Sequence, residues 1–256
     1  MLEIRNLCSG YGQKVVLHDV SAAAQAGQIT VILGPNGCGK STLLKTICGI
    51  LPASSGQALL DGQELLQLPS NQAAQKVAYL AQSRQIPDIS VGRLVLHGRF
   101  PYLSYPRRYR QEDYRIAQQV MERLQLLELA EQPLNRLSGG QQQKAYIAMA
   151  LAQDTDVILL DEPTTYLDVS YQLQMLRQAR DLARTGKHVV MVIHDLSHAL
   201  ETADKIVLMQ DGRVVMEGTP EEVYETGALE DTFRVRVTRV EIERNRHYFC
   251  SEKSDE

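Results

Sequence analysis

The sequence predicts an α/β fold built around parallel strands, and two observations carry this prediction. The β-branched run from Ile29 to Leu33 has the length of a buried strand and leads through glycines into a helical pattern. Farther along, Val157 to Leu160 reads as a strand, a helical stretch closes at Gly186, and Val189 to Ile193 reads as a second strand. A β-α-β succession of this kind implies a parallel pair.

The remaining elements follow in chain order. Apolar residues alternate between residues 2 and 20 around glycine turns, which predicts short antiparallel strands. A helix is expected from about Leu43 to Leu51, ended by Pro52. Residues 83 to about 153 are expected to be mostly helical, because prolines give way to an amphipathic pattern. Asp211-Gly212 predicts a hairpin, and alternating residues after about 230 predict further strands.

The composition is that of an ordinary globular protein. The 256 residues are 44% hydrophobic and 23% charged, and the net charge of −4 argues against a nucleic-acid partner. The short basic cluster at residues 107–110 is more typical of a solvated face. No apolar run approaches the ~18 residues that span a bilayer, and residues 1–13 do not resemble a signal peptide. At a membrane, a partner would therefore have to hold this chain.

The four cysteines carry little information about function. No C-x-x-C pair is present and no histidine lies at ligand spacing, so neither a zinc site nor a disulfide framework is expected. Reduced thiols of a cytosolic protein are the simple interpretation. Cys38 is the exception, because it precedes an expected helix. A helix N-terminus lowers thiol pKa, so we expect Cys38 to react with maleimide and a bound nucleotide to protect it.

The most informative motif is a phosphate cradle. The run Gly34-Pro35-Asn36-Gly37-Cys38-Gly39-Lys40-Ser41-Thr42 matches G-x-x-x-x-G-K-[ST]. Glycines let backbone N–H groups approach a triphosphate, and the following helix adds its positive dipole end. Lys40 is expected on the β- and γ-phosphates and the Ser41 hydroxyl on Mg²⁺. A chance match in a glycine-rich turn is disfavoured because the motif lies between a strand and a helix.

Two carboxylates end the strand that begins at Val157. Asp161 is placed to hold the Mg²⁺ shell, because phosphoryl transfer needs an acid beside the cradle. Side chains alternate along a strand, so Glu162 is expected to point elsewhere and to orient and deprotonate the attacking water. An acidic pair at a strand end is weak evidence alone, and the cradle favours the functional interpretation.

A second anion site is expected at Leu137-Ser138-Gly139-Gly140-Gln141. Ser138 can cap the helix that follows, and the two glycines expose backbone N–H groups. A plain helix cap would explain Ser138, but not two glycines that weaken a helix by up to ~1 kcal/mol each.

Gly34 to Thr42, Leu137 to Gln141 and Val157 to Glu162 resemble, in order, the Walker A, signature and Walker B motifs of ABC ATPases. LSGGQ is far more specific than the cradle alone. The resemblance implies ATP and Mg²⁺ as cofactors, bound by the residues of the cradle and of the signature, with Ser41 and Asp161 on the metal.

Single residues match further motifs of this family. Tyr11 resembles the aromatic that stacks on adenine, and Asp168 resembles the D-loop aspartate. Gln82 resembles the Q-loop glutamine, which senses the γ-phosphate, the metal and the membrane partner, and His194 resembles the switch histidine. Taken alone, each has an ordinary interpretation as a turn residue, loop amide, helix cap or strand end. Their joint order favours the family.

Three stretches resemble the ATPases of iron-siderophore, haem and cobalamin importers, namely Gly98 to Tyr102, Ala145 to Gln153 and Asp161 to Asp168. Two positions depart from the usual pattern. Residues 142–144 read Gln-Gln-Lys where Arg-Gln-Arg is usual, and Ala81 stands where many members have proline.

The resemblance implies one nucleotide-binding domain over residues 1–256: a P-loop NTPase (RecA-like) core, an antiparallel β subdomain, a helical subdomain at about 83–153 and a strand-rich tail at about 230–256. Two copies should sandwich two Mg-ATP, each between one cradle and the other chain's signature. Transmembrane permease subunits would dock near Gln82, and a substrate-binding protein would act indirectly. The chain would then be peripheral, at the cytoplasmic face of the cell membrane.

The alternative is an ABC ATPase without a transport role, in iron-sulfur assembly, translation or DNA repair. A translation factor normally carries two cradles and this chain has one. A repair ATPase carries a long heptad insert, whereas only about 100 residues separate Lys40 from Ser138. A fused exporter would need membrane spans, and a small P-loop kinase would not explain Leu137 to Gln141.

Overall fold

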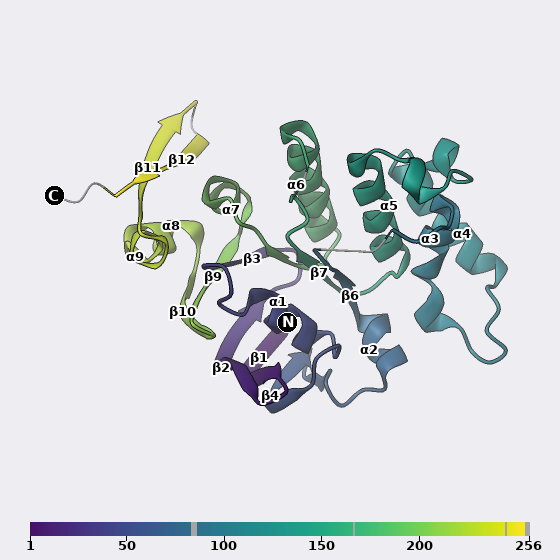
Figure 1. Cartoon of the computed structure of the whole chain (residues 1–256), viewed down its shortest axis with the longest axis horizontal. Coiled ribbons are helices and arrows are strands. Elements are labelled where there is room, and N and C mark those ends of the chain that lie inside the picture. The colour runs from purple at the N-terminus through teal and green to yellow at the C-terminus, as the bar shows by residue number, and fades with distance from the viewer. Residues whose placement is uncertain (83–85, 166, 244, 254–256) are drawn as a thin grey trace.

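The computed structural model describes residues 1–256 except 83–85, 166, 244 and 254–256 (Figure 1). Its centre is a six-stranded sheet of order β10-β9-β3-β8-β7-β6. The five strands β9, β3, β8, β7 and β6 pair in parallel, and β10 at the edge pairs antiparallel with β9. The strand bounds are β3 (Ile29–Leu33), β6 (Val77–Leu80), β7 (Val157–Asp161), β8 (His188–Val192), β9 (Lys205–Gln210) and β10 (Arg213–Gly218).

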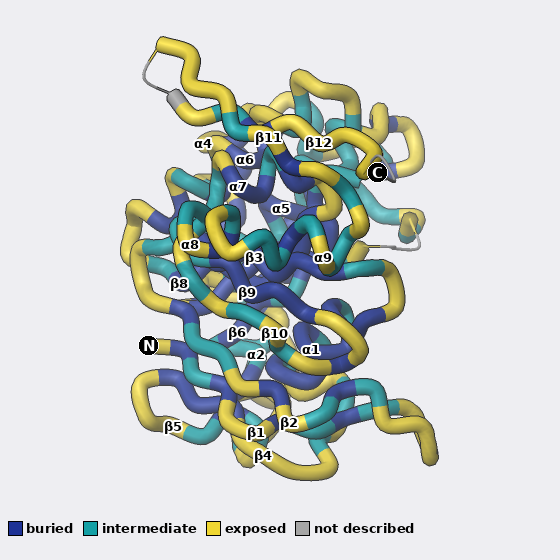
Figure 2. The backbone as a smooth tube through the Cα atoms, turned by 90° about the vertical axis from the view of Figure 1, so that its left-hand side faces the viewer, coloured by how far each residue is buried: buried dark blue, intermediate teal, exposed yellow. Residues whose placement is uncertain are grey.

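The central strands are buried on both faces, which is why their sequences are continuous apolar runs. In β3, Val31 and Leu33 belong to one hydrophobic core and Ile32 to the other. In β7, Ile158 and Leu160 likewise face the first core, while Leu159 faces the second. This alternation follows from the two-residue period of a strand. Figure 2 shows the sheet as the buried centre of the molecule.

A second, antiparallel sheet of order β2-β1-β4-β5 covers one face of this centre. Helix α1 (Lys40–Ile47) lies between the two sheets, and its Leu43, Leu44 and Ile47 belong to the second core. The helix ends at Ile47, four residues before the predicted end, because Gly49 adopts a left-handed φ of 73°. The strand bounds are β1 (Leu2–Tyr11), β2 (Lys14–Ala24), β4 (Ala53–Leu60) and β5 (Gln63–Glu64).

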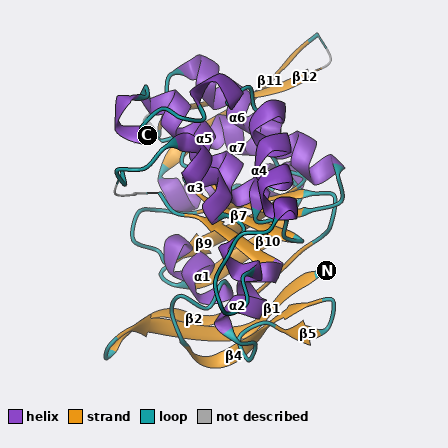
Figure 3. Cartoon of the chain, turned by 90° about the vertical axis from the view of Figure 1, so that its right-hand side faces the viewer, coloured by secondary structure: helices purple, strands orange, loops and turns teal. Residues whose placement is uncertain are grey.

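Helices cover the other face (Figure 3) and extend to one side of the sheet (Figure 1). Between β6 and β7 the described elements are all helical, and α3, α4 and α5 pack against one another. The predicted start of this region at Ser83 lies outside the described residues. The helix bounds are α2 (Ser70–Lys76), α3 (Val91–His97), α4 (Gln111–Arg123), α5 (Gly139–Ala152), α6 (Val169–Arg184), α7 (Leu196–Thr202), α8 (Pro220–Glu225) and α9 (Ala228–Phe233), with short 3₁₀ turns η1 (Phe100–Tyr102), η2 (Leu127–Leu129) and η3 (Leu134–Arg136).

The predicted C-terminal strands form a hairpin of their own. Strands β11 (Val235–Ile242) and β12 (Asn245–Glu252) pair only with each other among the described strands, and the hairpin packs on α7 (Figure 1). Val237 and Tyr248 anchor it in the first core. No helix in the described ranges is long and apolar enough to cross a bilayer.

Candidate active site

The predicted phosphate cradle is a loop between β3 and α1 whose backbone only glycine tolerates. Gly34, Gly37 and Gly39 have φ values of 153°, 78° and 107°. A Cβ at Gly34 would lie 2.2 Å from the carbonyl oxygen of Met209, and one at Gly39 would lie 2.9 Å from Leu17. The glycines therefore serve both the left-handed backbone and the close approach of neighbouring chain segments.

The lysine of the cradle is buried and held by the loop itself. Lys40 is 5% exposed, and its Nζ donates hydrogen bonds to the carbonyl oxygens of Gly34 at 2.7 Å and Pro35 at 2.9 Å. A buried ammonium needs such partners. The arrangement keeps the positive charge at the mouth of the loop, where an anion would meet it.

The lowered pKa expected for the Cys38 thiol is wrong in direction. The thiol is 5% exposed, and burial, as the largest cause, raises its pKa above the ordinary value although the nearby Lys40 charge opposes this. Desolvation disfavours the thiolate more than the Lys40 charge and the nearby backbone N–H groups favour it. Cys38 is therefore a packed residue of the loop and belongs to the second core.

Asp161 accepts one hydroxyl on each carboxylate oxygen. Ser41 Oγ donates to Oδ1 at 3.0 Å, and Tyr79 Oη donates to Oδ2 at 2.9 Å. Asp161 is 2% exposed, so both oxygens depend on protein partners. Burial and, next, the negative charge of Asp161 raise the pKa of Tyr79, which keeps the phenol protonated as a donor.

Glu162 leaves the strand direction at once. Its φ of 51° is left-handed, and its N–H donates to the carbonyl oxygen of Val192 at 3.2 Å. The prediction that Asp161 and Glu162 point apart is right, but the cause is this turn and not continued strand alternation. A left-handed non-glycine residue costs of order 1–3 kcal/mol and persists where the surroundings over-determine it.

Three side chains surround the Glu162 carboxylate. Gln82 Nε2 donates to Oε2, Thr165 Oγ1 donates to the same oxygen at 3.2 Å, and His194 Nε2 contacts Oε1. The Glu162 side chain is 8% exposed, whereas that of His194 is 43% exposed. Gln82 and His194, which are 112 positions apart in the sequence, therefore contact the same carboxylate.

A cavity of about 360 Å³ joins these groups to the cradle. Pro35 and Cys38 are absent from its lining, and so is Tyr11, which ends β1 and is 49% exposed. The lining residues are Val16, Asn36, Gly37, Gly39, Lys40, Ser41, Thr42, Gln82, Glu162 and His194. The cavity therefore brings a cationic loop, two hydroxyls and a carboxylate to one polar space.

The signature stretch lies outside this cavity. Ser138 caps α5 with a reciprocal capping box: its Oγ accepts from Gln141 N–H at 3.3 Å, and Gln141 Oε1 accepts from Ser138 N–H at 3.0 Å. Ser138 and Gly139 are exposed. The start of this helix is thus exposed to solvent, and its residues do not line the cavity beside the cradle of their own chain.

The second glycine of the signature is fitted against a ring of α6. A Cβ at Gly140 would lie 3.0 Å from the ring atoms of Tyr171. Asp168 caps α6 by accepting from the Tyr171 N–H at 3.0 Å, so its structural role as a helix cap is real. Tyr166, part of the same predicted D-loop, lies outside the described residues.

The family model described as "ABC transporter" matches residues 17–165, which is more than half of the chain. The chain belongs to the ABC transporter family. The petrobactin import ATP-binding protein FpuD of Bacillus anthracis is 40% identical over 91% of this chain and 86% of its own length. The iron(3+)-hydroxamate import ATP-binding protein FhuC of Bacillus subtilis (strain 168) is 40% identical over 91% and 88%.

Solved ABC structures share the fold. A metal-chelate type ABC transporter in an inward-facing conformation has a TM-score of 0.84, 27% identity and 98% coverage of each chain. A dimeric post-hydrolysis state of an ATP-binding cassette with ADP and phosphate has a TM-score of 0.73 and 27% identity over 86% of this chain and 99% of that one. The predicted fold class and ATPase activity are thereby confirmed for this ABC protein.

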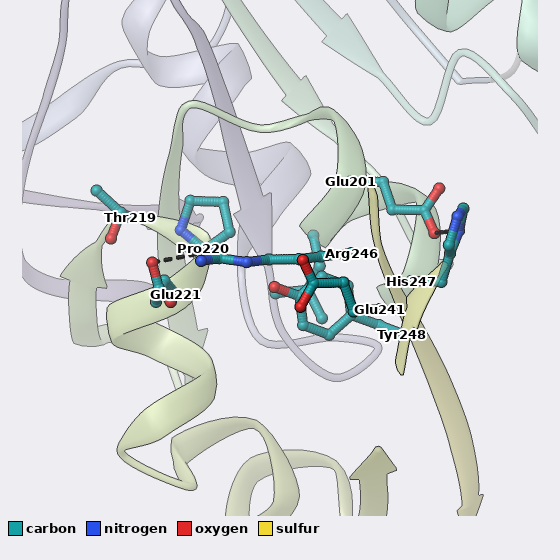
Figure 4. Close-up of a pocket in the computed structure, with 9 residues that line it drawn as sticks. Glu201, Thr219, Pro220, Glu221, Glu241, Arg246, His247 and Tyr248 are labelled. Carbon is teal, nitrogen blue, oxygen red and sulfur yellow. Dashed lines mark hydrogen bonds and ion pairs between the residues drawn. The ribbon is translucent and has the colours of Figure 1, made fainter. Parts of the chain in front are cut away.

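A larger cavity of this ABC subunit, about 770 Å³, lies between the C-terminal hairpin and helices α7 and α8 (Figure 4). Its two basic side chains are paired with glutamates. Arg246 reaches Glu221 at 2.8 Å, and His247 reaches Glu201 at 3.0 Å. With three glutamates on its wall, this space is unsuited to a polyphosphate, so the smaller, lysine-bearing cavity is the candidate nucleotide site.

Sequence reasoning missed three residues of the ABC site. Val16 lines the cavity, Thr165 bonds Glu162, and Tyr79 bonds Asp161. Thr165 had a local signal, because it lies three residues after Glu162. The positions of Val16 and Tyr79 depend on which strands become neighbours, and no motif marked them.

Proposed function

We propose that this chain is the ATP-hydrolysing subunit of an importer for an iron chelate. Its ATPase activity follows from the family, and the cargo class is supported by relatives whose names specify petrobactin and iron(3+)-hydroxamate import. The importer-like stretch from Gly98 to Tyr102 supports the same class. The observation that carries the catalytic part is the buried Glu162 carboxylate, held between Gln82 and His194 beside the cradle.

In this proposal Glu162 is the general base. Its carboxylate faces the cavity in which Lys40 and the loop N–H groups hold the phosphates, so it can accept a proton from a water aimed at the γ-phosphate. Gln82 and Thr165 fix the carboxylate, and His194, on its other oxygen, is placed to respond to the γ-phosphate. Tyr11, exposed at the end of β1, is the proposed adenine platform.

The donor set fits Mg²⁺. Ser41 Oγ and Asp161 Oδ1 are 3.0 Å apart, and the amide of Gln82 lines the same cavity. Mg²⁺ prefers oxygen ligands and commonly takes one or two carboxylates plus substrate phosphates. Once bound, Mg²⁺ would neutralise charge on the phosphates.

The second phosphate-binding element is proposed to act on another copy of the chain. Ser138, Gly139 and Gly140 do not line the candidate nucleotide cavity of their own chain, and Ser138 and Gly139 are exposed to solvent at a helix start. A solved cassette with the same fold is dimeric with ADP and phosphate. Two copies would then enclose two nucleotides, with Asp168 near the shared surface.

The membrane partners are proposed from the same relatives. An import ATP-binding protein acts with a permease, and this chain has no span among its described helices. We place the permease contact near Gln82 and the chain at the cytoplasmic face of the membrane, with a substrate-binding protein delivering cargo to the permease.

Uptake measurements test the cargo. Deletion of the gene should abolish uptake of at least one radio-iron chelate, and the wild-type gene, but not a Glu162→Gln gene, should restore it. Haem and cobalamin serve as comparison cargoes. Unchanged uptake of every iron chelate tested, with loss of haem or cobalamin uptake, would contradict the iron-chelate assignment and leave the ATPase assignment standing.

A further inference from the structure

Tyr79 lies outside every motif of the site but reaches its centre. It is on β6, whose parallel pairing with β7 sets Tyr79 beside Leu159, two residues before Asp161. The ring packs against the second core, between the central sheet and the antiparallel sheet. A ring anchored in this way holds its hydroxyl at a fixed point, because rotation about either side-chain torsion would break core packing.

The Tyr79 hydroxyl donates to the carboxylate oxygen of Asp161 that Ser41 does not contact. Tyr79 Oη donates to Oδ2 at 2.9 Å while Ser41 Oγ donates to Oδ1 at 3.0 Å. Two donors from different elements, β6 and α1, thus define the plane of a carboxylate that is 2% exposed. Without the Tyr79 hydroxyl, no described side chain holds Oδ2, and the Ser41 bond to Oδ1 alone restrains the terminal torsion of the carboxylate.

We propose that Tyr79 is a positioning residue for Mg²⁺: it fixes Asp161 in the orientation that faces the cradle. The inference rests on the proposed role of Asp161 at the metal. Groups that orient a metal ligand commonly change metal affinity or activity by 10- to 100-fold when removed. A merely structural tyrosine would alter stability but leave the metal dependence of nucleotide binding unchanged.

The test compares Tyr79→Phe with wild type and with Tyr102→Phe. Phenylalanine keeps the ring and removes only the hydroxyl. In the control, the lost hydroxyl is one that donates to the carbonyl oxygen of Gln153 at 2.9 Å in the helical region. Affinity for a fluorescent ATP analogue is measured first in EDTA and then during Mg²⁺ titration, and Mn²⁺ binding with ATP is followed by electron paramagnetic resonance. Thermal unfolding in EDTA verifies that each variant folds.

For Tyr79→Phe we expect an affinity in EDTA within about twofold of wild type. The half-saturating Mg²⁺ concentration should rise about tenfold, near the lower end of the effect of removing a group that orients a metal ligand. Tyr102→Phe should match wild type in both. In an Asp161→Asn background, adding Tyr79→Phe should shift the Mg²⁺ curve no further, because both changes disable one carboxylate position.

Two results overturn the inference. One is a Tyr79→Phe Mg²⁺ curve that superimposes on wild type. The other is an equal loss of affinity with and without Mg²⁺, which marks a structural role. If wild type itself gained no affinity from Mg²⁺, or if Asp161→Asn kept the wild-type curve, the proposed metal site would fail and Tyr79 with it, and these outcomes are distinguishable from failure of Tyr79 alone.

Discussion

The substitution Glu162→Gln removes the ability of this side chain to accept a proton but keeps its size and shape. The carboxylate has two donors on Oε2, from Gln82 and Thr165, and His194 Nε2 at Oε1. A glutamine oxygen can keep both donors, and its NH₂ can face the His194 ring if the neutral ring accepts. We therefore expect the fold and the nucleotide cavity to survive.

The expected loss of turnover follows from the missing general base. A positioned general base contributes about 10²- to 10⁴-fold to a rate, which corresponds to about 2.7–5.4 kcal/mol at about 1.36 kcal/mol per decade. The hydrogen bonds retained around the amide limit the change in unfolding free energy to about 1 kcal/mol. Turnover should thus fall by at least about 100-fold while stability barely changes.

Phosphate release at saturating ATP measures the loss, and binding of a fluorescent ATP analogue shows that the site persists. Glu201→Gln is the matched control, because that carboxylate pairs with His247 and lines the other cavity. It should retain wild-type turnover. The Glu162→Gln chain should also accumulate as an ATP-bound dimer in size-exclusion chromatography, since hydrolysis would no longer separate the copies.

Phosphate release by Glu162→Gln within tenfold of wild type would refute the assigned role. The carboxylate would then only position its neighbours. Loss of nucleotide binding in this variant would equally contradict the geometry, because the amide keeps the size of the side chain and two of its hydrogen bonds.

Three further predictions concern separate features. Ser138→Arg should leave nucleotide binding to the monomer intact but prevent ATP-dependent dimerisation in the Glu162→Gln background; an arginine chain that still pairs with itself would contradict the trans assignment. Because Cys38 is buried and Cys250 is exposed, thiol mapping by mass spectrometry should find Cys250 labelled well before Cys38. Burial raises the pKa of both thiols, so the labelling of Cys38 should speed up as pH rises; rapid neutral-pH labelling of Cys38 would show an open loop. Asp113→Ala leaves the buried guanidinium of Arg99 without its ion-pair partner and should lower the free energy of unfolding in denaturant by about 3–5 kcal/mol. A decrease below about 1 kcal/mol would show that water or another group replaces the carboxylate.

Features that depend on residues close together in the chain could be predicted from the sequence. The cradle could be predicted because left-handed turns and backbone approach demand glycine, and Gly34, Gly37 and Gly39 do adopt positive φ values. The strands around it could be predicted because double-sided burial requires continuous apolar runs. The cap at Ser138 was equally local, since its capping box spans three residues.

Contacts between distant segments could not be read in the same way. The sequence predicted Gln82, Glu162 and His194 only as separate matches to a family, and the tertiary structure joins them on one carboxylate. Pairing of β6 with β7 brings Tyr79 to Asp161, and the burial of Cys38 reverses the pKa expected from its helix. Propensity, turn chemistry and capping act over a few residues, so the sequence alone determined the fold class and the chemistry of each motif. Desolvation and strand neighbourhood depend on the whole packed chain, and only the tertiary structure decided them.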